Sequence, residues 1–169
     1  MSTVMDTVAG KGRNLGTNFW LVMLAVALLV FGANTGYAIW KAAQLIMGDL
    51  GGQIPSSVAG LKRLPGVGDY IAGAIASIAF GQTEIALDGN IKRVFARFLN
   101  MEIPLGTPPA EKALREFAEG QLPEGKAGDF NQALMDLGAL ICLPSNPRCL
   151  LCPISSECQA CQHGTQDLV

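Results

Sequence analysis

The sequence predicts an all-α protein, because apolar residues recur at helical spacing from residue 36 onwards and no segment alternates in polarity long enough for a strand. Half of the 169 residues are apolar and 15% are charged, against roughly 25% in an ordinary soluble domain. The length suffices for one domain with a sizeable core. The low charge content indicates a chain that is either unusually buried or incomplete, with core surface exposed.

An atypical apolar segment occupies residues 1–35, and residues 19–33 within it carry no charge. These fifteen residues fall short of the roughly 20 that span a bilayer, so we do not expect a membrane protein. The segment fits a buried core helix, the apolar core of a signal peptide with a poor cleavage site, or an artefactual start such as a shifted reading frame.

Between residues 36 and 141 the pattern predicts several helices separated by glycine and proline. The first two cover 37–50 and 56–64, and Ser56 and Ser57 suit the N-cap of the second. Asp129, with Gln132 three residues on, resembles a capping box at the start of the last helix. The further expected helices cover 69–80, 89–99, 108–120 and 130–142.

Two of these helices carry a predicted apolar stripe. In the helix over 69–80 it consists of Ile71, Ile75 and Ile78. In the helix over 130–142 the apolar residues at helical spacing are Ala133, Leu134, Leu137 and Ile141. The isoleucines stand beside the small residues Ala72, Gly73 and Ala76.

Residues Leu64-Pro65-Gly66-Val67-Gly68 break the chain between two short helices. The two glycines allow backbone conformations closed to other residues, and N–H groups at the following helix start can bind an anion. Lys62 and Arg63 add positive charge within a Debye length. The segment therefore fits either a helix-hairpin-helix that binds a DNA phosphate or an ordinary tight turn.

Asp88 lies where a loop enters the expected helix over 89–99. Taken alone it fits an N-cap, which stabilises by about 1 kcal/mol. Beside a phosphate-binding hairpin, however, a carboxylate could stabilise positive charge developing on a deoxyribose. The net charge of −2 does not indicate a nucleic-acid partner, but basic residues gather near these motifs while acidic residues lie elsewhere. The basic residues include Lys92, Arg93 and Arg148.

Five cysteines lie within the last 28 residues and none before them, whereas a disulfide scaffold would spread its cysteines to join distant segments. Four of them, with spacings of six, two and five residues, suit either tetrahedral zinc or a 4Fe-4S cluster. These candidate ligands are Cys142, Cys149, Cys152 and Cys158. Cys161 is left over, and one histidine, His163, does not suffice for a metal site built from several histidines.

Together these motifs resemble the helix-hairpin-helix superfamily of base-excision DNA glycosylases, and within it the adenine-specific branch. The residues that carry the resemblance are L-P-G-V-G-D-Y-I-A-G-A-I (64–75), L-D-G-N-I-K-R-V-F-A-R (87–97), F-N-Q-A-L-M-D-L-G-A-L-I-C (130–142) and the four cysteines. The resemblance implies a helix-hairpin-helix glycosylase-like helical domain over 36–141, an iron–sulfur cluster loop over 142–158 and a tail over 159–169. It favours 4Fe-4S over zinc.

By resemblance the reaction is monofunctional removal of adenine mispaired with 8-oxoguanine or guanine. Asp88 would stabilise the oxocarbenium-like transition state, and Asn90 would help to position it. DNA contacts would come from the hairpin residues Pro65 to Gly68 and from nearby side chains, namely Lys62, Arg63, Tyr70, Lys92, Arg93 and Arg148. Tyr70 stands where the endonuclease III branch carries its imine-forming lysine, so lyase chemistry by that route is excluded.

The sequence departs from the family in two places. The family's S-E-x-M-L-Q-Q-T stretch carries a glutamate that protonates the adenine, but no glutamate occurs before Glu84. The chain also ends eleven residues after Cys158, before any separate domain that reads 8-oxoguanine. We therefore expect an impaired or truncated glycosylase with severely reduced or no activity.

The remaining expectations follow from this resemblance. The partner would be double-stranded DNA with a flipped adenine, without a small-molecule substrate, and the protein would be a monomer in the bacterial cytoplasm, associated with the nucleoid. Three alternatives stay open: a non-catalytic iron–sulfur DNA-binding fragment, an endonuclease III-like glycosylase of other specificity, and a secreted or membrane-associated protein with disulfides.

Overall fold

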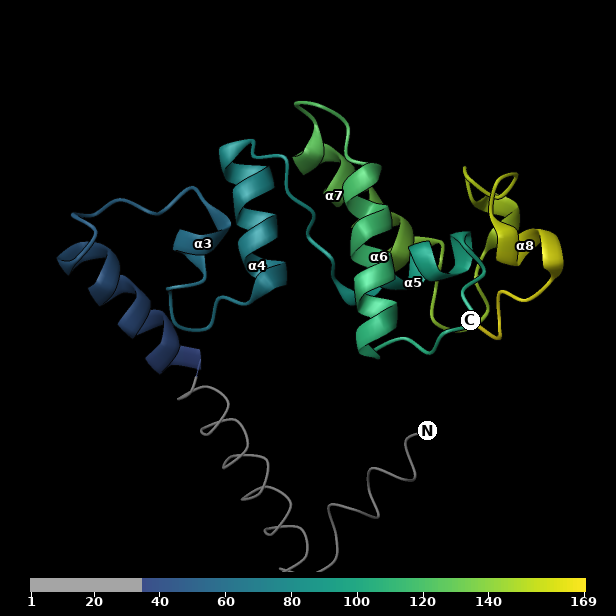
Figure 1. The fold of residues 1–169 in the computed structure, drawn as a ribbon, viewed down its shortest axis with the longest axis horizontal. Coiled ribbons are helices and arrows are strands. Elements are labelled where there is room, and N and C mark those ends of the chain that lie inside the picture. Colours follow the sequence, from purple (N-terminus) through teal and green to yellow (C-terminus); the bar gives the residue numbers. More distant parts are fainter. Residues whose placement is uncertain (1–34) are drawn as a thin grey trace, which may run out of the picture.

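The computed structural model describes residues 35–169, and every regular element in that range is helical (Figure 1). The predicted all-α class is confirmed. The predictions for the segment over 1–35 concern residues that, except for the last, lie outside the described part of the chain. Between residues 35 and 169, no helix is long and apolar enough to cross a membrane.

The first part of the fold contains a helix over residues 35–48, α3 (Val58–Leu61), α4 (Asp69–Ala74) and the π-helical turn η1 (Ile75–Ala79). Its small core comprises Leu61, Leu64, Ala72 and Ala76, and the helix over 35–48 packs partly buried apolar side chains against it. The helix α3 is shorter than the predicted 56–64. It begins after Ser57, whose hydroxyl accepts a hydrogen bond from the Gly60 amide at 3.2 Å, as expected for an N-cap.

The predicted helix over 69–80 forms, but it widens from α to π at Ile75. Inside this segment the Ser77 hydroxyl donates to the carbonyls of Gly73 and Ala74, at 2.8 and 3.3 Å, which competes with regular helix bonding. Of the isoleucines at helical spacing, Ile71 and Ile78 are exposed. The buried face instead consists of small residues, namely Ala72, Gly73, Ala76 and Ser77.

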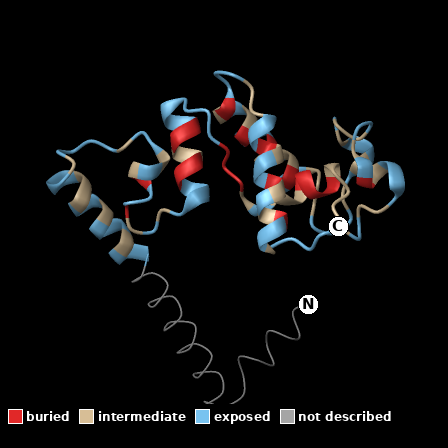
Figure 2. Cartoon of the chain, viewed as in Figure 1, coloured by how far each residue is buried: buried red, intermediate tan, exposed pale blue. Residues whose placement is uncertain are grey.

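Close approach of the following segment explains that small-residue face. A Cβ atom on Gly73 would lie 2.4 Å from the carbonyl oxygen of Ile85, so no side chain fits between the two backbones. The extended segment over 81–88 runs from η1 to the next helix, and its residues 85–87 are buried (Figure 2). This segment joins the two parts of the fold.

The second part contains α5 (Gly89–Phe98), α6 (Pro108–Gly120), α7 (Ala127–Leu140), the 3-10 turn η2 (Cys149–Leu151) and α8 (Gln159–His163). The sequence did not predict α8. Phe95 of α5 meets Phe117 of α6 edge to face, with ring centroids 5.2 Å apart. The core combines three helices with the extended segment, through Ile85, Leu87, Ile91, Val94, Phe95, Leu114, Ala118 and Leu134.

The helix α7 begins three residues before its predicted start. Asp129 therefore lies in the first turn and Lys126 is the N-cap, without a side-chain cap bond, so the predicted capping box is wrong. The Gln132 side chain instead donates to the carbonyl of Gly128 in its own helix, at 3.2 Å. The predicted apolar stripe is correct at Leu134, which is buried, and at Leu137, which packs against the core, whereas Ala133 is exposed. The other buried residues of α7 are Ala127, Asn131 and Gly138.

Candidate functional site

The hairpin over Leu64–Gly68 connects α3 to α4. Leu64 is buried in the core, whereas Gly66 and Gly68 are exposed. Gly66 has a φ of +84°, a left-handed conformation that disfavours other residues. Val67 closes the turn by donating its amide to the Leu64 carbonyl at 3.1 Å. Because Gly68 is the N-cap of α4 and carries no side-chain acceptor, the first amides of α4 point outwards without a capping side chain.

Lys62 and Arg63 stand exposed just before this turn. The Lys62 ammonium lies 2.5 Å from a carboxylate oxygen of Asp69, in the first turn of α4. The hydrogen bond and the charge of Lys62 lower the pKa of Asp69 below its ordinary value. Tyr70 follows, and it is also exposed. The hairpin thus presents amide groups and cations, but it also carries a carboxylate that neutralises one of the cations.

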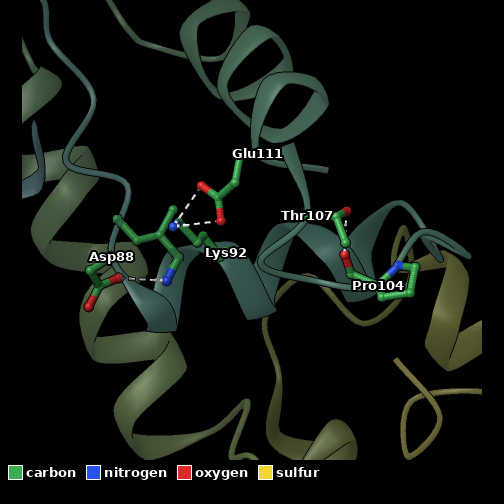
Figure 3. A network of polar contacts seen from close by, with 6 residues as sticks. Asp88, Lys92, Pro104, Thr107 and Glu111 are labelled. Carbon is green, nitrogen blue, oxygen red and sulfur yellow. Dashed lines mark hydrogen bonds and ion pairs between the residues drawn. The ribbon is translucent and has the colours of Figure 1, made fainter. Parts of the chain in front are cut away.

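Asp88 is the N-cap of α5 (Figure 3). It is half-buried. One carboxylate oxygen accepts the Ile91 amide at 2.7 Å, and the other accepts the Asn90 side-chain amide at 3.0 Å. The two bonds fix the orientation of the carboxylate, while each oxygen retains a second lone pair. The N-cap role is therefore present, and it leaves the carboxylate able to act on a charged group.

Two of the predicted DNA-binding cations are engaged inside the protein. Lys92 pairs with Glu111 of α6, its ammonium 2.7 and 2.8 Å from the two carboxylate oxygens (Figure 3). Arg93 donates to the side-chain oxygen of Asn90 at 2.9 Å and to the carbonyls of Gly138 and Cys142 at 2.7 and 2.8 Å. A continuous chain of hydrogen bonds therefore links Asp88, through Asn90 and Arg93, to the end of α7.

Asn131 on α7 holds the segment that leads to Asp88, and the sequence did not single it out. Its side chain is completely buried. The amide oxygen accepts the Ala86 backbone N–H at 3.1 Å, and the amide nitrogen donates to Ser77 and to the Glu84 carbonyl, both at 2.9 Å. Asn131 thus connects η1, α7 and the extended segment that leads into α5.

All five cysteines line one pocket between α5, the end of α7 and α8. Arg97 of α5 is only 3% exposed and donates to the Cys142 sulfur at 3.4 Å and to the carbonyls of Leu143 and Pro144 at 2.6 and 3.1 Å. The Cys158 thiol in turn donates to the Arg97 carbonyl at 3.5 Å. A buried guanidinium beside these sulfurs would compensate the charge of thiolates.

Burial raises the pKa of the Cys149 and Cys152 thiols, and for Cys149 the neighbouring Cys161 thiol adds to the effect. In residues 35–169, no three cysteine, histidine or acidic side chains are grouped so as to hold a single metal ion. The donor set is nevertheless purely thiol, which suits a soft metal centre such as an iron–sulfur cluster. Arg148, on the loop beside this pocket, is exposed, with a long 3.5 Å contact to the Leu140 carbonyl.

Comparison with known proteins agrees with these features. A family model described as "Helix-hairpin-helix motif" matches residues 49–78. An adenine DNA glycosylase of Homo sapiens is 40% identical over 135 residues, which is 79% of this chain and 25% of the human protein. An adenine DNA glycosylase of Buchnera aphidicola is 43% identical over 122 residues, 72% of this chain and 34% of that protein. The chain thus spans about a quarter to a third of the length of these relatives.

Solved structures show the same fold. A thermostable thymine-DNA glycosylase superposes with a TM-score of 0.65 and 35% identity, covering 73% of this chain and 56% of that one. A trapped endonuclease III–DNA covalent intermediate gives the same TM-score at 24% identity, covering 78% of this chain and 60% of that one, and shows likeness of fold alone. The chain is therefore a helix-hairpin-helix protein with the fold of DNA glycosylases. More narrowly, it is a homologue of the adenine DNA glycosylases.

Proposed function

We propose that this chain binds duplex DNA through its hairpin and hydrolyses the N-glycosyl bond of adenine mispaired with 8-oxoguanine or guanine. The observation that carries the proposal is the 40% identity to an adenine DNA glycosylase over 79% of the chain. An alignment of that extent necessarily includes both the hairpin over 64–68 and Asp88. The similarity therefore covers the two features to which the proposal assigns DNA binding and chemistry.

DNA binding rests on the hairpin and on the side chains that the fold leaves free. A phosphate oxygen would accept hydrogen bonds from the first amides of α4, where the helix dipole also favours an anion. Arg63 and Arg148 are exposed and are available for phosphates. Lys92 and Arg93 are engaged by protein partners, so their part in DNA binding would be to fix α5 and Asp88 in place.

The chemistry rests on Asp88. With the adenine flipped out of the helix, at a cost of a few kcal/mol, cleavage of its glycosidic bond leaves positive charge on the deoxyribose. A carboxylate already fixed by the Ile91 and Asn90 amides would stabilise that charge without having to reorganise. Because asparagine caps helices as well as aspartate does, the substitution Asp88→Asn tests this role without removing the cap.

The four cysteines Cys142, Cys149, Cys152 and Cys158 would hold a 4Fe-4S cluster. When bound, the cluster would cross-link the loop over 142–158 and fix the position of its exposed Arg148. Arg97 supports this assignment, because its buried positive charge lies beside the Cys142 sulfur. We further propose a monomer in the bacterial cytoplasm, in line with the Buchnera relative, acting on double-stranded DNA that bears a flipped adenine.

The expected rate is low. No glutamate precedes Glu84, so the general acid that protonates adenine in the family is not supplied by a matching residue. General acid catalysis contributes typically 10²–10⁴-fold, and the chain should be slower by about that factor than a glycosylase that carries this glutamate. The same departure favours a second candidate function, binding to DNA without base removal.

Excision can be measured with protein in excess over a duplex that carries adenine opposite 8-oxoguanine. After incubation, hot alkali breaks the strand wherever a base has been removed. We expect slow accumulation of breaks at the mispaired adenine and none in a matched duplex with adenine opposite thymine. Binding without any break over many hours would refute excision and support the second candidate. Breaks in both duplexes would refute the mispair specificity.

A further inference from the structure

Arg97 of α5 is a buried cation in the cysteine pocket. The residue is 3% exposed and lines the pocket together with the five cysteines. The ion pairs formed within residues 35–169 do not include it. Its side chain donates to the Cys142 sulfur and to the carbonyls of Leu143 and Pro144, which are neutral groups. Because burying a charge is costly unless the charge is paired, we expect this pocket to hold an anion.

One donor of the same guanidinium has no partner. Among the buried side-chain nitrogen and oxygen atoms of residues 35–169, only Nε of Arg97 lacks a hydrogen bond. Buried polar groups of native proteins are almost always paired, so an exception calls for an explanation. Here the unpaired N–H belongs to a residue that lines a pocket of thiols. An acceptor bound among these thiols would satisfy it.

Two of the proposed cluster ligands contact Arg97 directly. Nη1 of Arg97 lies 3.4 Å from the Cys142 sulfur, and the Arg97 backbone carbonyl accepts a hydrogen bond from the Cys158 thiol at 3.5 Å. A bound 4Fe-4S cluster fits both requirements of the guanidinium. It is an anion, because its sulfides and four thiolates together outweigh the positive charge of the iron. Its sulfur atoms also accept hydrogen bonds.

We propose that Arg97 donates its free Nε–H to a sulfur atom of the bound cluster and supplies the counter-charge that retains the cluster in this pocket. The inference rests on the proposed iron–sulfur cofactor. Removal of an electron makes the cluster less negative, and a buried cation beside it disfavours that removal. Arg97 would therefore raise the reduction potential of the cluster and slow its oxidative loss.

Voltammetry of the loaded full chain, without DNA, tests the electrostatic part of the proposal. Arg97→Gln removes the charge and should shift the reduction potential to a more negative value, and its iron and sulfide should be lost in air several-fold faster. Arg97→Lys keeps the charge but lacks the Nε–H, so it should shift the potential less. The matched control Arg148→Gln removes an equal charge from an exposed position of the loop, where solvent and salt screen it, and should leave the potential nearly unchanged.

The inference would be overturned if Arg97→Gln shifted the potential no more than Arg148→Gln. Circular dichroism shows whether a variant is folded, and the wild-type protein itself decides if Arg97→Gln is not.

The hydrogen bond can be detected in wild-type protein that carries nitrogen-15 in its arginine guanidinium groups. With the cluster reduced to a paramagnetic state, pulsed electron paramagnetic resonance should show a coupling between guanidinium nitrogen and the electron spin. The coupling should persist in Arg148→Gln and disappear in Arg97→Lys. A wild-type spectrum without it, or its persistence in Arg97→Lys, would overturn the inference. A wild-type protein without iron or sulfide after anaerobic purification would instead refute the proposed cofactor, and the role of Arg97 with it.

Discussion

Replacing Asn131 by leucine should destabilise the protein strongly, although the two side chains are similar in size. Asn131 is completely buried and makes three hydrogen bonds, to Ala86, Ser77 and Glu84. Leucine would leave the N–H of Ala86, itself fully buried, without a partner, at a cost of about 1–3 kcal/mol. The two lost bonds to Ser77 and Glu84 cost about 0.5–1.5 kcal/mol each.

These losses together amount to about 2–6 kcal/mol, and burying an apolar side chain offsets about 1–2 kcal/mol of them. We therefore expect the free energy of unfolding to fall by about 1–4 kcal/mol, a sizeable part of the 5–15 kcal/mol typical of a domain. Urea denaturation followed by circular dichroism measures the change. The matched control is Gln132→Leu, at the neighbouring exposed position, for which we expect a change within about 0.5 kcal/mol.

A fall of less than about 0.5 kcal/mol in Asn131→Leu would refute this reasoning, since it would mean that the amide does not hold the extended segment. The prediction also concerns the site. The segment that Asn131 holds leads directly to Asp88, so the variant should lose excision even at temperatures at which it remains folded. Retention of full excision by the folded variant would show that Asp88 is positioned by α5 alone.

Three further predictions concern the close packing beside Asn90 and the charge at the hairpin. In Gly138→Ala the new Cβ would lie 2.6 Å from the Asn90 Cβ, so we expect the free energy of unfolding, measured with urea, to fall by about 1–3 kcal/mol. The control is Gly120→Ala, at an open helical position, which should be neutral or slightly stabilising. Asp69→Asn should free Lys62 for a phosphate, so the affinity for DNA, measured by fluorescence anisotropy, should rise several-fold. The slope of the logarithm of the binding constant against the logarithm of the salt concentration should become steeper by about 1. An unchanged affinity would contradict this prediction. Because the pKa of Asp69 is lowered, its ion pair should add a small stabilisation that is fully present above the ordinary carboxyl pKa of about 3.9. This stabilisation should be lost as the pH falls through the lowered pKa. It should not change between pH 6 and 8.

The helices could be predicted from the sequence wherever a local signal determines them. Ser57 marks the start of α3, two prolines mark the start of α6, and glycines end the helix over 35–48. The faces that pack together could not be predicted in the same way. Gly73 is buried because another backbone approaches it so closely that no side chain fits. The spacing of apolar residues does not reveal where a side chain must be absent.

The candidate site shows the same division. The positions of Asp88, the hairpin and the cysteines followed from residue types and spacing. The role of Asn131 could not be predicted, because a polar residue in an amphipathic helix is expected to face solvent. Only the fold brings the Ala86 amide to it. The inward orientation of Arg93 depends likewise on carbonyls 45 and 49 residues away in the sequence, which no local pattern reveals.

We propose above that this one chain both binds DNA and supplies the carboxylate that supports glycosidic cleavage. Parallel measurement of binding and single-turnover excision in Asp88→Asn tests it most directly, on the duplex with adenine opposite 8-oxoguanine. We predict that the dissociation constant stays within about twofold, since the helix cap is retained, while excision becomes undetectable. Excision at the wild-type rate in this variant would contradict the claim and leave Asp88 with its role as the cap of α5.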